Sequence, residues 1–131
     1  MSTAARFRAA IESNDLDAAS ELFASQIIFH SPITFHPFIG RDTVRRLLGE
    51  VAQVFEDFRY TDELAGSESH ALIFRAAVGE REVEGVDLLR FDEDGQVADF
   101  TVLLRPLSGL MPFAQAMAER VAAAGLQTTP S

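Results

Sequence analysis

The second half of the chain contains four strand-like segments joined by connections of only a few residues. The segments are residues 58–65, 71–78, 81–91 and 97–105. The connections between them are rich in Gly, Ser, Asp and Glu, which are typical turn residues. Connections this short join antiparallel neighbours, because a parallel pair needs a crossover of about a dozen residues or more. The sequence therefore predicts an antiparallel meander of four strands.

The first half of the chain has helical periodicity instead. Apolar residues recur at helical spacing from Phe7 to Ile11, and again from Leu16 to Phe23 after Asp15, which is suited to cap the second helix. A short strand over residues 26–31, a loop over 32–40 and an amphipathic helix over 43–55 follow. These helices and the meander together predict an α+β domain, with helices covering one face of a curved antiparallel sheet.

After Pro106 the sequence returns to helical spacing, which predicts an extra C-terminal helix over about 109–124 that ends near Gly125. Residues 127–131 are expected to form a frayed tail. The whole chain, 1–131, is expected to form a single domain, with its core in residues 4–105. A domain of this size buries roughly two-thirds of the surface of its unfolded chain, so a sizeable core is available.

Composition and charge exclude several classes of partner. The net charge is −9, with 11 basic residues against 20 acidic ones, so nucleic acid and anionic membranes are not expected as partners. The chain has no cysteine, no recognisable leader and no apolar run of membrane-spanning length. We therefore expect a soluble, cytoplasmic protein.

Asp87 is the residue that most directly suggests a site. Period-two alternation along residues 83–91 places Asp87 on the same strand face as Val83, Leu89 and Phe91. A carboxylate on an apolar face is unfavourable unless something satisfies it or uses it. It is either a functional hydrogen-bond donor or acid in a pocket, or an acid satisfied by a backbone amide, a water or a nearby Arg or His.

Several short motifs follow one another in a characteristic order. They are Asn14-Asp15-Leu16-Asp17, Leu22-Phe23-Ala24, His30-Ser31-Pro32, Gly40-Arg41-Asp42 and the hairpin segment 86–97. In this order the chain resembles the nuclear transport factor 2-like superfamily, and within it the SnoaL-like proteins related to ketosteroid isomerase and limonene epoxide hydrolase. The resemblance covers about residues 4–105. It implies a cone-shaped fold in which the sheet wraps around the N-terminal helices and encloses one apolar pocket, and dimers that form through the sheet.

The resemblance to ketosteroid isomerase matches one catalytic position of three. The tyrosine that polarises the substrate carbonyl corresponds to Phe7, which has no hydroxyl, and the general-base aspartate corresponds to Ser31, which is a poor base near neutral pH. The oxyanion-hole acid, which is kept protonated in an apolar site so that it can donate a hydrogen bond, corresponds to Asp87. A match at one catalytic position of three is not enough to predict an isomerase.

The resemblance to the other relatives implies that this chain has apolar side chains at most of the positions that are catalytic in those relatives. Polar groups of limonene epoxide hydrolase correspond to Phe29, Ser31, Leu72, Phe74 and Val102. Those of the SnoaL cyclases correspond to Phe100 and Val102. We therefore expect a pocket lined by apolar side chains, with Asp87 as its retained polar group. Phe7, Phe29, Ser31, Leu72, Phe74, Phe100 and Val102 are the predicted ligand-binding residues; alternatively the aromatic rings close the pocket into solid core.

Histidines provide the remaining candidates for acid–base chemistry. His36 lies on the loop that rims the pocket in the family and is a candidate base, whereas strand parity puts His30 on the opposite face from Phe29 and Ser31. His70 is expected at the surface in a turn. Three scattered histidines without cysteine form no metal-binding pattern, and the chain has no Gly-rich phosphate loop, so we expect neither a metal nor another cofactor.

The opposite face of the sheet is too apolar to lie wholly in water. It carries Ile73, Ala77, Val86, Leu88 and Leu103 among Arg75, Glu84, Arg90 and Asp99. A homodimer interface through this face would cover it. The C-terminal helix could instead cover this face, or it could close the pocket.

Three hypotheses for function follow. The first is a protein that binds a small, largely apolar molecule in a pocket polarised by Asp87. The second is an isomerase, cyclase or dehydratase acting on a hydrophobic carbonyl compound, with Asp87 as acid and His36 as base. The third is a non-catalytic dimeric assembly module with a closed pocket. Fold resemblance supports all three, because function resides in the site and not in the fold.

Overall fold

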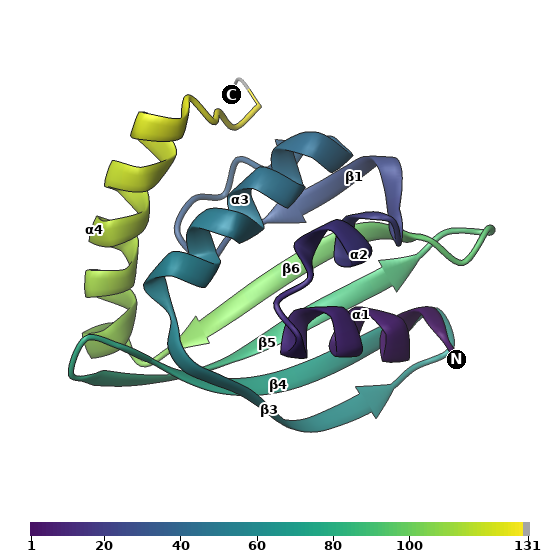
Figure 1. Ribbon diagram of the computed structural model, residues 1–131, viewed down its shortest axis with the longest axis horizontal. Helices are drawn as coiled ribbons and strands as arrows, with labels where there is room; N and C mark the ends of the chain where they lie inside the picture. The colour runs from purple at the N-terminus through teal and green to yellow at the C-terminus, as the bar shows by residue number, and fades with distance from the viewer. Residues whose placement is uncertain (130–131) are drawn as a thin grey trace.

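The computed structural model describes residues 1–129, and its centre is one curved, open sheet of six strands (Figure 1). The strands are β1 (Phe23–His30), β2 (Phe38–Ile39), β3 (Glu56–Ala65), β4 (Ser69–Val78), β5 (Arg81–Phe91) and β6 (Val97–Arg105). Strands β3 to β6 form the antiparallel meander that the short connections predicted. The spatial order is β2-β1-β6-β5-β4-β3.

Strand β1 extends the meander by pairing in parallel with β6, opposite Phe100 and Thr101 at its end. It begins at Phe23, three residues earlier than the predicted strand, and the predicted second helix is correspondingly shorter. The backbone explains this difference, because the amide of Val97 donates to the carbonyl oxygen of Leu22 at 2.9 Å and Phe23 pairs with Val97. Through this long-range pairing, residues whose local spacing is helical become part of a strand.

Within residues 1–129, four helices cover one face of the sheet (Figure 1). They are α1 (Thr3–Glu12), α2 (Leu16–Ser20), α3 (Arg41–Val54) and α4 (Leu107–Ala124). The side chain of Ser2 accepts a hydrogen bond from the amide of Ala5 and caps α1, and Asp15 caps α2 as predicted by accepting from the amide of Ala18. The predicted α+β architecture is confirmed.

The inner face of the sheet carries the core. On β5, Val83, Asp87 and Leu89 are buried on this side, as the alternation predicted. Phe91 is only half-buried, because the pairing of β5 with β6 shifts register between Arg90 and Phe91. Strand parity therefore predicts the inner face correctly up to this irregularity.

Two glycines allow elements to approach the inner face of β5 closely. A Cβ atom at Gly85 would lie 2.3 Å from Cζ of Phe74 and 2.6 Å from the carbonyl oxygen of Leu103, so the glycine makes room for the Phe74 ring. A Cβ atom at Gly109 would lie 2.4 Å from Cγ1 of Val83, so this glycine lets the start of α4 rest on β5. Both positions shape the space between helices and sheet.

Helix α4 lies on the same side of the sheet as the other helices and contacts α3, β4, β5 and β6. It does not cover the opposite face of the sheet. The chain after it is also held, since Leu126 is buried and the amide of Thr129 donates to the carbonyl oxygen of Pro37 at 2.8 Å. The expectation of a frayed tail is therefore wrong for residues 127–129, and residues 130–131 lie outside the described part. Within residues 1–129, no helix is long and apolar enough to cross a membrane.

Candidate functional site

A cavity of about 990 Å³ lies between the helices and the inner face of the sheet. Its walls come from helices α1 to α4 and strands β1 to β6, and most of the lining side chains are apolar, with Phe and Leu the commonest. The residues after α4, including Leu126 and Thr129, complete the wall near the loop between β1 and β2. A largely apolar cavity of this size with few polar groups is typical of a small-molecule site.

Asp87 is the polar group on the inner wall of this cavity. It lies on β5 directly across from Leu72 on β4 and Val102 on β6, and only 6% of its surface is exposed. The phenol of Tyr60 on β3 donates a hydrogen bond to Oδ2 of Asp87 at 2.7 Å. The carboxyl group is therefore held in one orientation by a neighbour that is itself buried.

The second carboxyl oxygen of Asp87, Oδ1, keeps some accessible surface. In the described part of the chain, the hydrogen bond from Tyr60 is the one that the carboxyl group of Asp87 makes, and it uses Oδ2. No fully buried side-chain oxygen or nitrogen of residues 1–129 lacks a partner, so Oδ1 has accessible surface, and Asp87 lines the cavity. A bound molecule could reach this oxygen without displacing Tyr60.

Burial makes both protonation states of Asp87 available near neutral pH. Desolvation raises the pKa of Asp87 to about 7, while the hydrogen bond from Tyr60 opposes this rise. Burial, and then the charge of Asp87, raise the pKa of the Tyr60 phenol well above its ordinary value, so Tyr60 remains a donor. Protonated Asp87 can donate from Oδ1 to an acceptor in the cavity, and ionised Asp87 can accept there.

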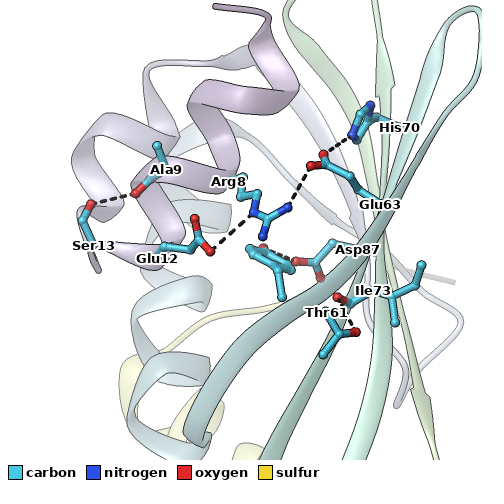
Figure 2. Close-up of polar contacts among 10 residues, drawn as sticks. Arg8, Ala9, Glu12, Ser13, Thr61, Glu63, His70, Ile73 and Asp87 are labelled. Atoms are coloured by element: carbon cyan, nitrogen blue, oxygen red, sulfur yellow. Dashed lines mark hydrogen bonds and ion pairs between the residues drawn. The ribbon is translucent and has the colours of Figure 1, made fainter.

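A cluster of charged side chains links Arg8 and Glu12 of α1 to Glu63 of β3 and His70 of β4 (Figure 2). The guanidinium of Arg8 lies 5.7 Å from the centre of the Tyr60 ring and donates to Glu63 at 2.8 Å, and its Nε lies 3.4 Å from Glu12. Nε2 of His70 lies 2.7 Å from Oε2 of Glu63, and this hydrogen bond lowers the pKa of Glu63. His70 was expected in a surface turn; it lies instead in β4 and points toward α1, because its strand begins at Ser69.

The structure places six of the seven predicted ligand-binding residues around the cavity. These six are Phe7, Phe29, Ser31, Phe74, Phe100 and Val102. Leu72 does not line the cavity; it has no exposed surface and packs within the hydrophobic core. Contact of the six with a ligand stays a prediction.

The histidines lie apart from Asp87. His36 lines the cavity from the exposed loop between β1 and β2, and the hydrogen bonds of the described residues include none between His36 and Asp87. His30 points to the opposite side of the sheet, as strand parity predicted, and its Nε2 lies 3.0 Å from Oδ2 of Asp99. In residues 1–129, no group of three or more His, Cys, Asp or Glu side chains is arranged to hold a metal ion.

Tyr60 is the hydrogen-bond partner of Asp87, and the sequence pattern did not predict it. It is the one tyrosine in the chain, and it lies in a segment whose strand character was predicted. The register pairs Tyr60 with Phe74 on β4, while Leu72 pairs with Asp87, so the phenol reaches diagonally across β4. A lone tyrosine on the inner face of a strand was the available sign, but the register across β4 was needed to place it beside Asp87.

The comparisons with known proteins agree with this architecture. The family model described as the SnoaL-like domain matches residues 4–100. The chain belongs to the SnoaL-like family. No curated protein matches it.

Solved structures similar to this SnoaL-like protein include one of a steroid delta-isomerase from Pseudomonas aeruginosa, with 38% identity, a TM-score of 0.87, and coverage of 95% of this chain and 93% of the other. Another is an uncharacterised protein with a cystatin-like fold from Silicibacter pomeroyi DSS-3, with 34% identity, a TM-score of 0.88, and coverage of 94% and 87%. An NTF2-like protein of unknown function from Cytophaga hutchinsonii ATCC 33406 shares the fold at 14% identity, a TM-score of 0.63, and coverage of 79% and 88%. The family model thereby confirms the resemblance to the SnoaL-like proteins, and these structures confirm the nuclear transport factor 2-like fold.

Replacing Tyr60 with Phe in this SnoaL-like protein is expected to raise the pKa of Asp87 above 7, because the hydrogen bond from Tyr60 is the contribution that lowers it. Above neutral pH the variant should also lose about 1–3 kcal/mol of unfolding free energy, since a buried carboxylate loses its donor. Carbon-13 NMR titration of the Asp87 carboxyl group and urea denaturation measure the two effects.

Thr61→Val is the matched control, because it removes an exposed hydroxyl from the same strand and should leave the titration of Asp87 unchanged. The role given to Tyr60 is wrong if Asp87 titrates identically in Tyr60→Phe and in the wild type.

Proposed function

We propose that this SnoaL-like protein binds a small, largely apolar molecule in the cavity, with Asp87 as the principal polar contact. The observation that carries the proposal is the geometry of Asp87, which is buried, lines the cavity and is bonded to Tyr60 through Oδ2, while Oδ1 keeps some accessible surface. The volume of about 990 Å³ and the aromatic lining support an apolar body for the ligand. They also favour this role over that of an assembly module with a closed pocket.

Protonated Asp87 suits a ligand that presents a carbonyl oxygen. Near neutral pH a substantial fraction of the carboxyl group is protonated, and in that form Oδ1 can donate a hydrogen bond in a site of low polarity. Phe7, which corresponds to the tyrosine of ketosteroid isomerase, is fully buried among aromatic rings and offers no second donor. The proposed contact is therefore a single hydrogen bond.

The proposal is tested with 2-adamantanone, a compact ketone with an apolar cage, by isothermal titration calorimetry. If binding needs protonated Asp87, affinity for the wild type should weaken about tenfold from about pH 6 to about pH 8, since the competent fraction falls by that factor around a pKa of about 7. Affinity of Asp87→Asn should not change with pH, because asparagine does not titrate. Absence of saturable binding to the wild type, or the same pH profile in both proteins, contradicts the proposal.

The second candidate function is that of an isomerase, cyclase or dehydratase acting on a hydrophobic carbonyl compound. It is favoured by the 38% identity to the steroid delta-isomerase from Pseudomonas aeruginosa. Asp87 would act as the acid that stabilises a developing enolate, and His36 on the rim of the cavity would act as the base. Turnover of a ketone substrate that is abolished by both Asp87→Asn and His36→Gln would support it, whereas turnover that survives both substitutions would exclude these roles.

We further propose a homodimer through the outer face of the sheet. Leu103 on this face is 55% exposed, and half-buried Ile73, Val86 and Leu88 lie near it around ion pairs of Glu84. Light scattering at micromolar concentration should give the mass of a dimer for the wild type and of a monomer for Leu103→Asp. Leu107→Asp, at an exposed position of α4, is the matched control and should stay dimeric. A monomeric wild type would contradict this proposal.

A further inference from the structure

The surroundings of Asp87 contain no cationic partner for its ionised form. Among the described residues that line the cavity, the titratable side chains are Glu12, His36 and Asp87, and none is Lys or Arg. The guanidinium of Arg8 lies 5.7 Å from the centre of the Tyr60 ring and is paired with Glu12 and Glu63. Tyr60 supplies one hydrogen bond, although an ionised carboxylate can accept several.

Phenylalanines occupy the positions diagonal to Asp87 on both neighbouring strands. Asp87 lies opposite Leu72 and Val102, and Phe74 and Phe100 occupy the diagonal positions, two residues along β4 and β6. Diagonal neighbours in a sheet are about 7–8 Å apart, within reach of large side chains. Both rings line the cavity, as does Phe58, which stacks on Phe74 with ring centres 4.9 Å apart. The faces of such rings attract cations, most strongly where water is excluded.

We propose that the cavity also accepts hydrophobic ammonium ions, bound through an ion pair with Oδ1 of Asp87 and contacts with Phe74 and Phe100. The ligand supplies the positive charge that the protein does not, and the apolar body of the ligand fills the rest of the cavity. The net charge of −9 attracts cations toward the protein and repels anionic ligands. This inference rests on the proposed function, because it uses the same cavity and the same carboxyl group.

The ammonium class and the ketone class require opposite protonation states of Asp87. A primary alkylammonium group has a pKa near that of lysine, about 10.4, so it stays charged across the neutral range. The fraction of ionised Asp87 rises about tenfold from about pH 6 to about pH 8. Glu12 and His36 line the cavity, Tyr60 bonds to Asp87, and Arg8 and its partner Glu63 lie beside Tyr60. Variants must therefore show which group sets any pH response.

The experiment compares 1-aminoadamantane with 2-adamantanone, which share the apolar cage, by calorimetric titration of the full chain at several pH values. Affinity of the wild type for the amine should rise about tenfold from about pH 6 to about pH 8, while affinity for the ketone falls. Asp87→Asn should lose this rise. Glu21→Gln, which removes one exposed negative charge away from the cavity, should keep it.

The outcomes separate this inference from the proposed function. Binding of the ketone without binding of the amine overturns the inference and leaves the proposed function standing. Failure of both probes to bind overturns both. Amine binding that does not strengthen with pH in the wild type overturns the contact with Asp87. A rise that persists in Asp87→Asn and disappears in Glu12→Gln also overturns it, because the cation then binds near Glu12. If Asp87→Asn does not fold, Glu12→Gln and His36→Gln decide instead: a rise with pH that persists in both supports the contact with Asp87, and a rise that is lost in either overturns it.

Discussion

The wild type is expected to lose about 4 kcal/mol of unfolding free energy, relative to Asp87→Asn, as the pH rises from about 4 to about 8. The pKa of Asp87 is 3.8 in an unfolded chain and about 7 in the folded protein, a difference of about three units at about 1.4 kcal/mol each. Because the folded state holds the proton more tightly, the stabilising contribution is complete below the unfolded pKa and is lost as the pH rises through the folded pKa.

Urea denaturation of both proteins across this range measures the effect, and the difference between their unfolding free energies cancels the titration of the other acids. The difference should change mainly between about pH 4 and about pH 7 and then level off. A difference that is constant with pH would mean that Asp87 titrates alike in both states. A difference that changes in the opposite direction would mean that the folded protein stabilises the carboxylate.

Replacing Phe100 with Ala is expected to destabilise the fold by about 3–5 kcal/mol, the usual effect of removing a buried Phe side chain. The ring of Phe100 is buried and lies 5.4 Å from that of Phe7 and 5.0 Å from that of Phe29, both in edge-to-face geometry. Its loss removes these contacts and enlarges the cavity. Urea or thermal denaturation measures the change.

Phe35→Ala is the matched control for Phe100→Ala, because it removes the same ring from a side chain that is 97% exposed. Its effect should stay within about 0.5 kcal/mol. Comparable destabilisation by the two substitutions would contradict the assignment of Phe100 to the cavity wall and the core.

The sequence allowed the sheet and its inner face to be predicted because both follow from local patterns. Short turn connections dictate antiparallel pairing, and alternation along β5 places Asp87 on the buried face. The parallel pairing of β1 with β6 could not be predicted in this way. It joins Phe23 to Val97 across most of the chain, and the residues around Phe23 have helical spacing on their own.

The site was predicted in part for the same physical reason. Asp87 stands out in a single strand, whereas its partnership with Tyr60 depends on the register of three strands and on the register shift in β3 after Tyr60. Leu72 is a second example. Strand parity puts it on the inner face of the sheet, but the packing of the side chains, which the sequence pattern does not give, decides which inner residues line the cavity. Residues 126–129 join the cavity wall through the buried side chain of Leu126 and the backbone contact of Thr129 to Pro37, and no local sequence pattern predicts either.

A crystal structure of the protein soaked with 2-adamantanone below pH 7 tests the central claim most directly. The account predicts the ketone inside the cavity, with its oxygen within hydrogen-bonding distance of Oδ1 of Asp87 while Tyr60 keeps its contact to Oδ2. A cavity filled by protein side chains, or a ketone bound away from Asp87, would contradict it.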